Sequence, residues 1–414
     1  MFFRSLVVVF YGFGTFTLLY HAPAYGQKEV QTILKAENFL LQGDTSKAMT
    51  EYKQALAHFP QNFVVTKRLA ELYYELTDYY HAILYTNIAL DITDEYLNRQ
   101  DLLLAEGKGQ MSKQELQEQT EKKHQYRSDK SDAHHLKGLI RLKQMKHDEA
   151  LEELDRAIQL NASNNSLYID KATVLTAMGK LPAAKKYLHK AAKEPLLAGK
   201  AHFSLGNLFF KEKGLDSALY YYNSAIQLNP LFKLTYKYKG LVLTEKQRYR
   251  EAVEAFTRFI QLDDRSEDVF FRRAVLYNEL GESSNALEDW TKVLTLNPEN
   301  QEAWRNRGLT YFKKAEYELA VKDFDEALSL EPDQSFTRIN RGYSYYLLNR
   351  PNEALEDLDE GIKQMPNYYW GRYFRALVKL QLRKRKEACK DVRKAIELGM
   401  KEEDLDRVFL KKCF

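Results

Sequence analysis

Side chains with a spacing suited to chemistry are few in this sequence. It contains no GxxxxGK[ST] phosphate loop, no GxSxG nucleophile elbow, no HExxH zinc motif and no CxxC pair. His134 and His135 are adjacent, so on a helix their side chains point about 100° apart and cannot share a metal ion unaided. With His124 and His147 nearby, a weak metal site is the alternative to ordinary surface histidines, which we favour. We predict no catalytic residue, no metal and no cofactor.

The two cysteines, Cys389 and Cys413, exclude a disulfide-dense scaffold and a four-cysteine zinc site. In an oxidising compartment they can pair and fasten the C-terminal end to the preceding helix. Spacing alone does not place their Cβ atoms, so two free thiols remain the alternative.

The overall charge is nearly balanced. With 62 Lys and Arg against 58 Asp and Glu, the net charge of +4 argues against a protein that mainly binds nucleic acid. The short basic run Arg383–Lys386 is interpreted as a solvated loop, with an acidic partner or an anionic lipid surface as the alternative.

One charge pattern repeats along the chain. Bases occur at Lys35, Lys137, Lys171, Lys239, Arg273, Arg307, Arg341 and Arg375, and the positions sixteen residues later include Glu51, Glu153, Asp289, Asp323, Asp357 and Asp391. We interpret Arg273–Asp289, Arg307–Asp323, Arg341–Asp357 and Arg375–Asp391 as ion-pair rungs between two helices, because an arginine fork can bond a carboxylate twice. The alternative, a ladder of free arginines for phosphate or acidic peptide, is disfavoured because the matched acids would neutralise it.

The elements that position these charges repeat every 34 residues. Steps of 34 from Ala48 reach alanine at every position except Leu116, ending at Ala388. A second series from Ala36 to Ala376 is Ala or Gly except at Leu104. Small residues at fixed places let helices approach closely, and proline after a helix marks a join, as at Pro298 and Pro332. Each unit is predicted to be a pair of antiparallel helices that must stack on its neighbours.

These units resemble the tetratricopeptide repeat (TPR). The resemblance is carried most fully by one unit, through Trp304, Gly308, Tyr311, Tyr317, Ala320, Phe324, Ala327 and Pro332. It implies an all-α, right-handed superhelical solenoid of 34-residue helix-turn-helix repeats with a concave groove. It also implies a binding or scaffolding role toward proteins or peptides, without identifying the partner.

The repeats suggest the domain organisation. We expect an N-terminal pair of repeats in 27–96, eight contiguous repeats in 131–402 and a capping helix in 403–414. Residues 97–130 keep the length but place large residues where small ones belong, so they are a degenerate repeat or a helical spacer, with a local hinge.

The N-terminus has the plan of a signal peptide. One basic residue precedes an uncharged apolar run from Ser5 to Tyr20, and the small residues Ala24 and Gly26 stand before Gln27. We expect residues 1–26 to be cleaved, with an uncleaved membrane anchor as the alternative. The expected location is the bacterial periplasm, or association with the outer membrane.

The expected working surface is the groove, which in the resembled family is lined mainly by first-helix residues. Aromatic and aliphatic side chains at helical spacing there are Phe336, Ile339, Tyr343 and Tyr346, then Trp370, Tyr373 and Leu377. The alternative is that these helices are rotated, so that the second set belongs to the core.

The resemblance does not extend to a chaperone-tail site. Family members that bind such tails use a Lys/Asn/Asn/Lys/Arg set, and the equivalent positions here hold Phe203, Asn207, Tyr238, Asp268 and Arg272. We predict a non-enzymatic envelope scaffold that binds a protein or peptide and no nucleic acid, with a chaperone-like holder of unfolded exported chains as the alternative.

Overall fold

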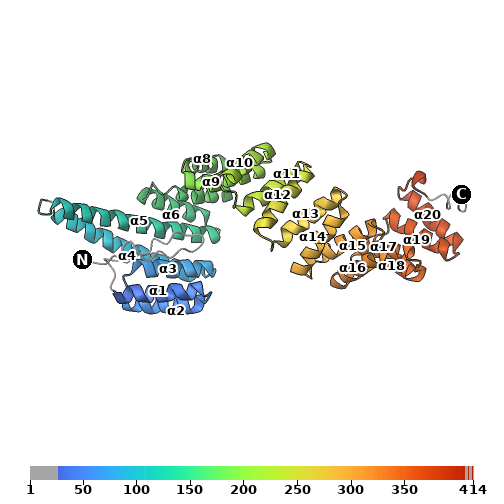
Figure 1. Cartoon of the computed structure of the whole chain (residues 1–414), viewed down its shortest axis with the longest axis horizontal. Helices are drawn as coiled ribbons and strands as arrows, with labels where there is room; N and C mark the ends of the chain where they lie inside the picture. The colour runs from blue at the N-terminus through green and yellow to red at the C-terminus, as the bar shows by residue number, and fades with distance from the viewer. Residues whose placement is uncertain (1–26, 108, 406–408, 410–412, 414) are drawn as a thin grey trace. The chain divides into compact units, whose positions relative to one another are not determined.

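A computed structural model describes residues 27–107, 109–405, 409 and 413. Their regular structure is entirely helical, with twenty α-helices, one 3-10 turn and no strand, so the expected all-α solenoid is confirmed (Figure 1). The chain divides into two compact units, one up to Leu208 and one from Phe209. The predicted signal peptide, residues 1–26, lies outside the described residues. No described helix is both long and apolar enough to span a bilayer.

The first unit is built from helix pairs joined by short turns. Its helices are α1 (Gln27–Leu41), α2 (Thr45–His58), α3 (Phe63–Glu75), α4 (Tyr79–Glu106), α5 (Lys113–Lys143), α6 (His147–Leu160), α7 (Ser166–Ala177) and α8 (Leu181–Ala191), and α9 (Pro195–Lys211) carries the boundary.

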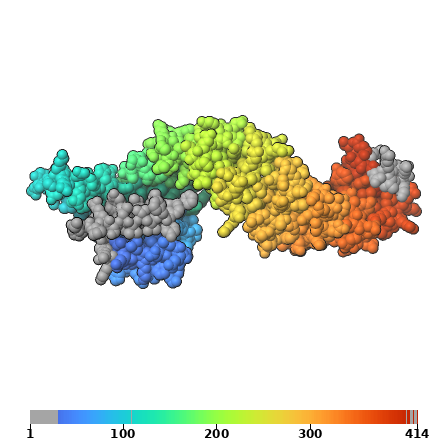
Figure 2. Space-filling view, in the orientation of Figure 1, coloured from blue at the N-terminus to red at the C-terminus, as the bar shows by residue number. Residues whose placement is uncertain are grey.

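The second unit continues the same plan. Its helices are α10 (Leu215–Leu228), α11 (Lys233–Glu245), α12 (Tyr249–Leu262), α13 (Glu267–Glu279), α14 (Ser283–Leu296), α15 (Gln301–Lys313), α16 (Tyr317–Leu330), α17 (Ser335–Leu347), α18 (Pro351–Gln364), α19 (Tyr369–Gln381) and α20 (Arg385–Glu397), followed by the 3-10 turn η1 (Glu402–Asp404). From α10 onward each helix packs on the next, and the surface colours follow one another in chain order (Figure 2).

The turn inside each helix pair has a left-handed residue that also recurs every 34 residues. Positive φ angles occur at Gly43, Thr77, Met145, Gly179, Lys213, Gln247, Gly281, Ala315, Asn349 and Arg383. The next amide bonds to the carbonyl five residues earlier, as from Asp78 N to Tyr73 O at 2.9 Å, which is the Schellman arrangement. Only three of these positions are glycine, so the other turns hold a side chain in a conformation that costs about 1 kcal/mol.

The recurring small residues lie where two helices meet. Ala48 on α2 and Ala388 on α20 are fully buried, as are the other alanines of that series in the described helices. In the second series, a Cβ added at Gly240 would lie 2.6 Å from the Phe256 ring, and one at Gly308 would lie 2.8 Å from the Phe324 ring. Glycine is therefore needed on the first helix where the second helix carries a phenylalanine.

Residues 97–130 do not form a helix pair of their own. They are mostly the ends of α4 and α5, which run antiparallel beyond their neighbours (Figure 1). Met111, at the repeating turn position, lacks the positive φ. Ser112 and Glu115 form the capping box that starts α5.

The seam of this extension is partly polar. Gln100 is almost fully buried and donates from its Nε2 to the backbone and side-chain oxygens of Gln119, at 3.1 and 2.8 Å. Because α4 packs along α5 and α3 also contacts α5, the stack continues across the segment where we expected a hinge. The division into two compact units falls at Leu208 and Phe209.

Candidate functional site

A hollow of about 550 Å³ opens on the second unit, between α11, α13 and the start of α15. Helical spacing brings Leu241 and Thr244 to one stripe of α11, and Asp268, Phe271 and Val275 to one stripe of α13. The remaining lining comes from Phe256, Glu267, Arg272, Leu276, Asn300 and Glu302.

The floor of the hollow is largely apolar. Phe271 packs edge-on against the fully buried Trp290, with ring centres 4.9 Å apart. Val275 is 36% exposed, so its methyl groups face the opening, whereas Leu276 beneath it is buried. Phe271 and Val275 thus give the hollow apolar surface that an aliphatic or aromatic side chain could contact.

Charged groups of both signs stand around this floor, and each is already paired. Asp268 accepts from Arg272 Nε at 2.8 Å and pairs with Lys237 Nζ at 2.8 Å. Burial raises the pKa of the Asp268 carboxyl, but these two cations outweigh burial and hold the pKa below its ordinary value. Glu267 accepts from the side-chain amides of Asn297 and Asn300. Because Arg272 and Lys237 are both engaged, this rim offers no clamp for a terminal carboxylate.

Three of the seven predicted groove residues on α17 and α19 belong to the core. Ile339 is fully buried, and its Cδ1 would lie 3.2 Å from a Cβ added at Gly371 on α19. Tyr373 and Leu377 are also buried, beneath the C-terminal cap. The groove assignment was wrong for these three residues, because Ile339 faces the next helix pair, whereas Tyr373 and Leu377 face α20 and the residues after it.

The other predicted groove residues keep part of their surface. Phe336 is 41% exposed and lies beside Tyr368. Tyr343, Tyr346 and Trp370 are partly buried. They pack against the apolar cluster that α19 and α20 form with the C-terminal residues.

The sequence analysis did not predict the hollow, although its lining residues occupy the same places in their repeats as the predicted groove residues. Val275 and Leu241 stand two and three repeats before Tyr343, and Thr244 stands three repeats before Tyr346. In α17 the Tyr343 ring stacks on Phe374 at 3.9 Å and fills the space between neighbouring helices. The smaller side chains of α11 and α13 leave that space open, so side-chain volume decides where the hollow lies.

The structure brings all four predicted arginine rungs together. Arg273 donates from Nε and Nη2 to the two oxygens of Asp289 at 2.8 and 2.7 Å. The same two-bond arrangement joins Arg307 to Asp323, Arg341 to Asp357 and Arg375 to Asp391. Burial raises the pKa of Asp289 and Asp323 in spite of these bonds, so desolvation offsets much of the attraction.

Each arginine also makes a third bond that the sequence reasoning missed. Nη1 of Arg273 and of Arg307 donates to Thr257 and Thr291, and Nη1 of Arg341 donates to Asp325 at 2.7 Å. Arg375 repeats this with Asp359. These acceptors lie sixteen residues before the arginine, on the second helix of the preceding repeat, so the rungs also join neighbouring repeats. Counting sixteen residues backward as well as forward would have found them.

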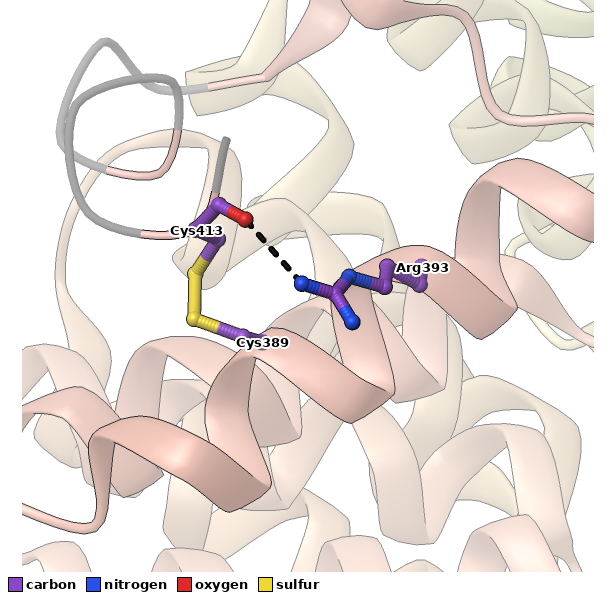
Figure 3. Close-up of a disulfide and its surroundings, with 3 residues drawn as sticks. All are labelled: Cys389, Arg393 and Cys413. Carbon is purple, nitrogen blue, oxygen red and sulfur yellow. Dashed lines mark hydrogen bonds between the residues drawn. A yellow bond between two sulfur atoms is a disulfide. The ribbon is translucent and has the colours of Figure 1, made fainter.

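The two cysteines form a disulfide in this structure. Cys389 on α20 bonds to Cys413, and Arg393 Nη2 donates to the Cys413 carbonyl at 3.3 Å (Figure 3). Phe409 is fully buried against the same cluster. The alternative of two free thiols is therefore wrong for this structure.

Two of the four histidines considered for metal binding, His134 and His135, pair with carboxylates. His134 Nδ1 lies 2.6 Å from Glu153, and His135 Nε2 lies 2.8 Å from Asp170. No group of three His, Cys, Asp or Glu side chains in the described part of the chain is placed to hold a metal ion.

Stacked helix pairs with a recurring turn define an α-solenoid, a class built for binding along its length. Two family models, both described as tetratricopeptide repeat, match residues 169–231 and 302–334. The chain therefore contains tetratricopeptide repeats in these two stretches.

The curated relatives resemble the chain over limited regions. Anaphase-promoting complex subunit 3 of Schizosaccharomyces pombe is 24% identical over 131 residues, which is 32% of this chain and 20% of that protein. Protein O-mannosyl-transferase TMTC3 of Mus musculus is 30% identical over 106 residues, 25% of this chain and 11% of that protein. The chain thus matches a fifth or less of the length of these curated relatives.

Two solved structures are similar to part of the chain. A tetratricopeptide repeat protein from Parabacteroides merdae has a TM-score of 0.40 and 20% identity, covering 60% of this chain and 97% of that one. YrrB, described as a TPR protein with an unusual peptide-binding site, has a TM-score of 0.38 and 20% identity. The match covers 56% of this chain and 99% of YrrB.

Proposed function

We propose that this protein is a scaffold for a partner protein. The partner inserts one of its own apolar side chains into the hollow between α11, α13 and α15. The repeats of this chain support protein–protein interaction as the general role. The observation that carries the finer proposal is the open apolar floor of Phe271 and Val275 inside a rim of paired charges. Buried apolar anchors surrounded by polar groups are the usual core of a protein interface.

The proposed place of action is the bacterial envelope. The apolar N-terminal run and its small-residue flank support export. The Cys389–Cys413 disulfide supports an oxidising compartment, since such bonds are rare in the cytosol. An uncleaved N-terminal anchor would leave the protein on the same side of the membrane.

The experiment uses a photo-crosslinking amino acid in place of Thr244, at the wall of the hollow. The tagged protein is expressed with its full N-terminus, irradiated in cells and recovered from the envelope fraction. One or two stoichiometric partners are expected. They should be lost with Val275→Glu, which puts a charge on the floor, and kept with Leu330→Glu, an equal change at a 42% exposed site on α16.

Other outcomes discriminate the alternatives. A broad range of exported proteins, equally sensitive to Val275→Glu, would support the chaperone-like holder instead. Crosslinks that survive Val275→Glu would show that the hollow is not the binding site. Recovery in the cytosolic fraction would overturn the envelope location.

A further inference from the structure

The C-terminal end of the chain carries its excess positive charge. Residues 369–414 contain 14 Lys and Arg against 7 Asp and Glu, a net charge of +7. The whole chain has 62 Lys and Arg against 58 Asp and Glu. Residues 1–368 therefore hold 48 basic against 51 acidic residues and are slightly acidic. The near-neutral total therefore conceals a local basic surface.

The structure gathers part of this charge on one exposed face. Lys386, Lys390, Arg393 and Lys394 are exposed and follow the spacing i, i+4, i+7, i+8 on α20, whose opposite face packs into the core. Arg383 and Lys384 are exposed in the turn just before this helix. We call these six residues the C-terminal basic surface.

Little inside the described part of the molecule compensates this surface. Lys394 pairs with Glu397 at 2.8 Å, but Arg383, Lys384, Lys386 and Lys390 form no ion pair with any described residue. Cations at the start of a helix oppose its dipole, and like charges four residues apart repel. The arrangement weakens the helix in isolation, so an external polyanion is the natural source of compensation.

We propose that the C-terminal basic surface docks on the phosphate groups of an anionic lipid bilayer. No large apolar side chain of α20 or of the turn before it is exposed, whereas the centre of a packed protein interface is normally apolar or aromatic. A row of cations without such anchors suits a charged surface that needs no shape complementarity. The same row offers no exposed aromatic ring on which bases could stack, which disfavours single-stranded nucleic acid.

The choice of lipid over duplex nucleic acid also rests on the envelope location given under the proposed function. The basic surface itself does not involve the hollow, since its residues lie on α20 and the preceding turn. Membrane docking and partner binding can therefore succeed or fail separately.

The test measures binding of the disulfide-intact chain from Gln27 onward to lipid vesicles by flotation. One set of vesicles holds equal parts of phosphatidylglycerol and phosphatidylcholine, and the other holds phosphatidylcholine alone. The variant Arg383→Gln/Lys386→Gln/Lys390→Gln removes three unpaired cations. Its matched control, Lys47→Gln/Lys213→Gln/Lys363→Gln, removes the same charge at side chains that are 66, 74 and 77% exposed.

We expect binding only to the anionic vesicles, with release at high salt. The surface variant should bind roughly 100-fold more weakly and the control should bind as the parent does, because each cation near an anionic membrane adds about a fivefold gain. Equal loss in both variants, or no binding by the parent at low salt, would overturn the proposal.

Two further measurements complete the test. One distinguishes lipid phosphate from nucleic-acid phosphate, and the other distinguishes the basic surface from the hollow. Tighter binding to duplex DNA than to vesicles would reassign the surface to nucleic acid and overturn the lipid proposal. The Val275→Glu variant should bind vesicles normally even if it loses its partner. If it loses vesicle binding, the hollow and not α20 contacts lipid, which also overturns the proposal.

Discussion

Replacing Arg341 by leucine tests whether the rungs hold the helix pairs together. Its guanidinium bonds both oxygens of Asp357 on α18 at 2.7 Å and Asp325 on α16 at 2.7 Å. Asp357 is only 4% exposed. Leucine keeps much of the apolar stem but leaves this carboxylate with one distant cation, Arg338, whose Nη1 lies 3.8 Å away.

The expected loss is about 3 kcal/mol of unfolding free energy. Removing one partner of a buried ion pair costs roughly 3–5 kcal/mol, and the lower end applies because the Arg341 side chain is 18% exposed and Arg338 remains near. Loss of the bond to the half-exposed Asp325 adds little, since such pairs contribute about 0–1 kcal/mol. For a unit of this size the melting temperature should fall by about 6–12 °C.

Urea unfolding and thermal melting followed by circular dichroism provide the assay. Arg258→Leu, at an exposed arginine of α12, is the matched control and should change stability by less than about 0.5 kcal/mol. The double variant Arg341→Leu/Asp357→Leu should recover most of the loss, because a buried pair replaced by apolar residues is often neutral. The reasoning is refuted if Arg341→Leu matches the control, or if the double variant is as unstable as the single one.

Three further changes test the turn, the helix contact and the cap. Thr77→Gly should stabilise the protein by about 1 kcal/mol in urea unfolding, because Thr77 is β-branched at φ 62°; an unchanged midpoint would contradict this. Gly240→Ala should cost about 1–2 kcal/mol despite better helix propensity, since its Cβ meets the Phe256 ring, and Phe256→Leu should restore part of the loss. Cys389→Ser/Cys413→Ser should cost about 3 kcal/mol for a loop of 24 residues and speed trypsin cleavage after 400; equal cleavage rates would count against a pinned cap.

The helix pairs and rungs could be predicted because repetition multiplies weak signals. A single arginine sixteen residues before an aspartate means little, but four such pairs at one repeat position identify facing side chains. The same argument placed the buried alanines. Periodicity also marked residues 97–130 as different, yet it does not distinguish a decayed repeat from helices that simply fail to end.

The site could not be placed because it depends on differences between repeats. Tyr343 and Val275 occupy the same repeat position, but a ring fills the space that a valine leaves open. Ile339 fits the groove pattern and is nevertheless buried, since Gly371 allows the next helix close to it. The disulfide required the positions of Phe409 and Cys413 against α20, which spacing does not supply.

The rungs also bear on which repeat can yield to a partner. In a solenoid, stability is a sum of repeat and interface contributions, so the most weakly joined repeat opens first. Lys239 occupies the rung position one repeat before Arg273. The positions sixteen residues after and before it hold Ala255 and Asn223, so neither offers a carboxylate. Burial lowers the pKa of Lys239. The helix that carries it, α11, also provides Leu241 and Thr244 to the hollow. We therefore expect faster amide hydrogen exchange in α11 than in α13. Exchange in α11 should slow when a partner binds. Equal protection of the two helices in the free protein would show that the missing ion pair at Lys239 does not loosen the helix that lines the hollow.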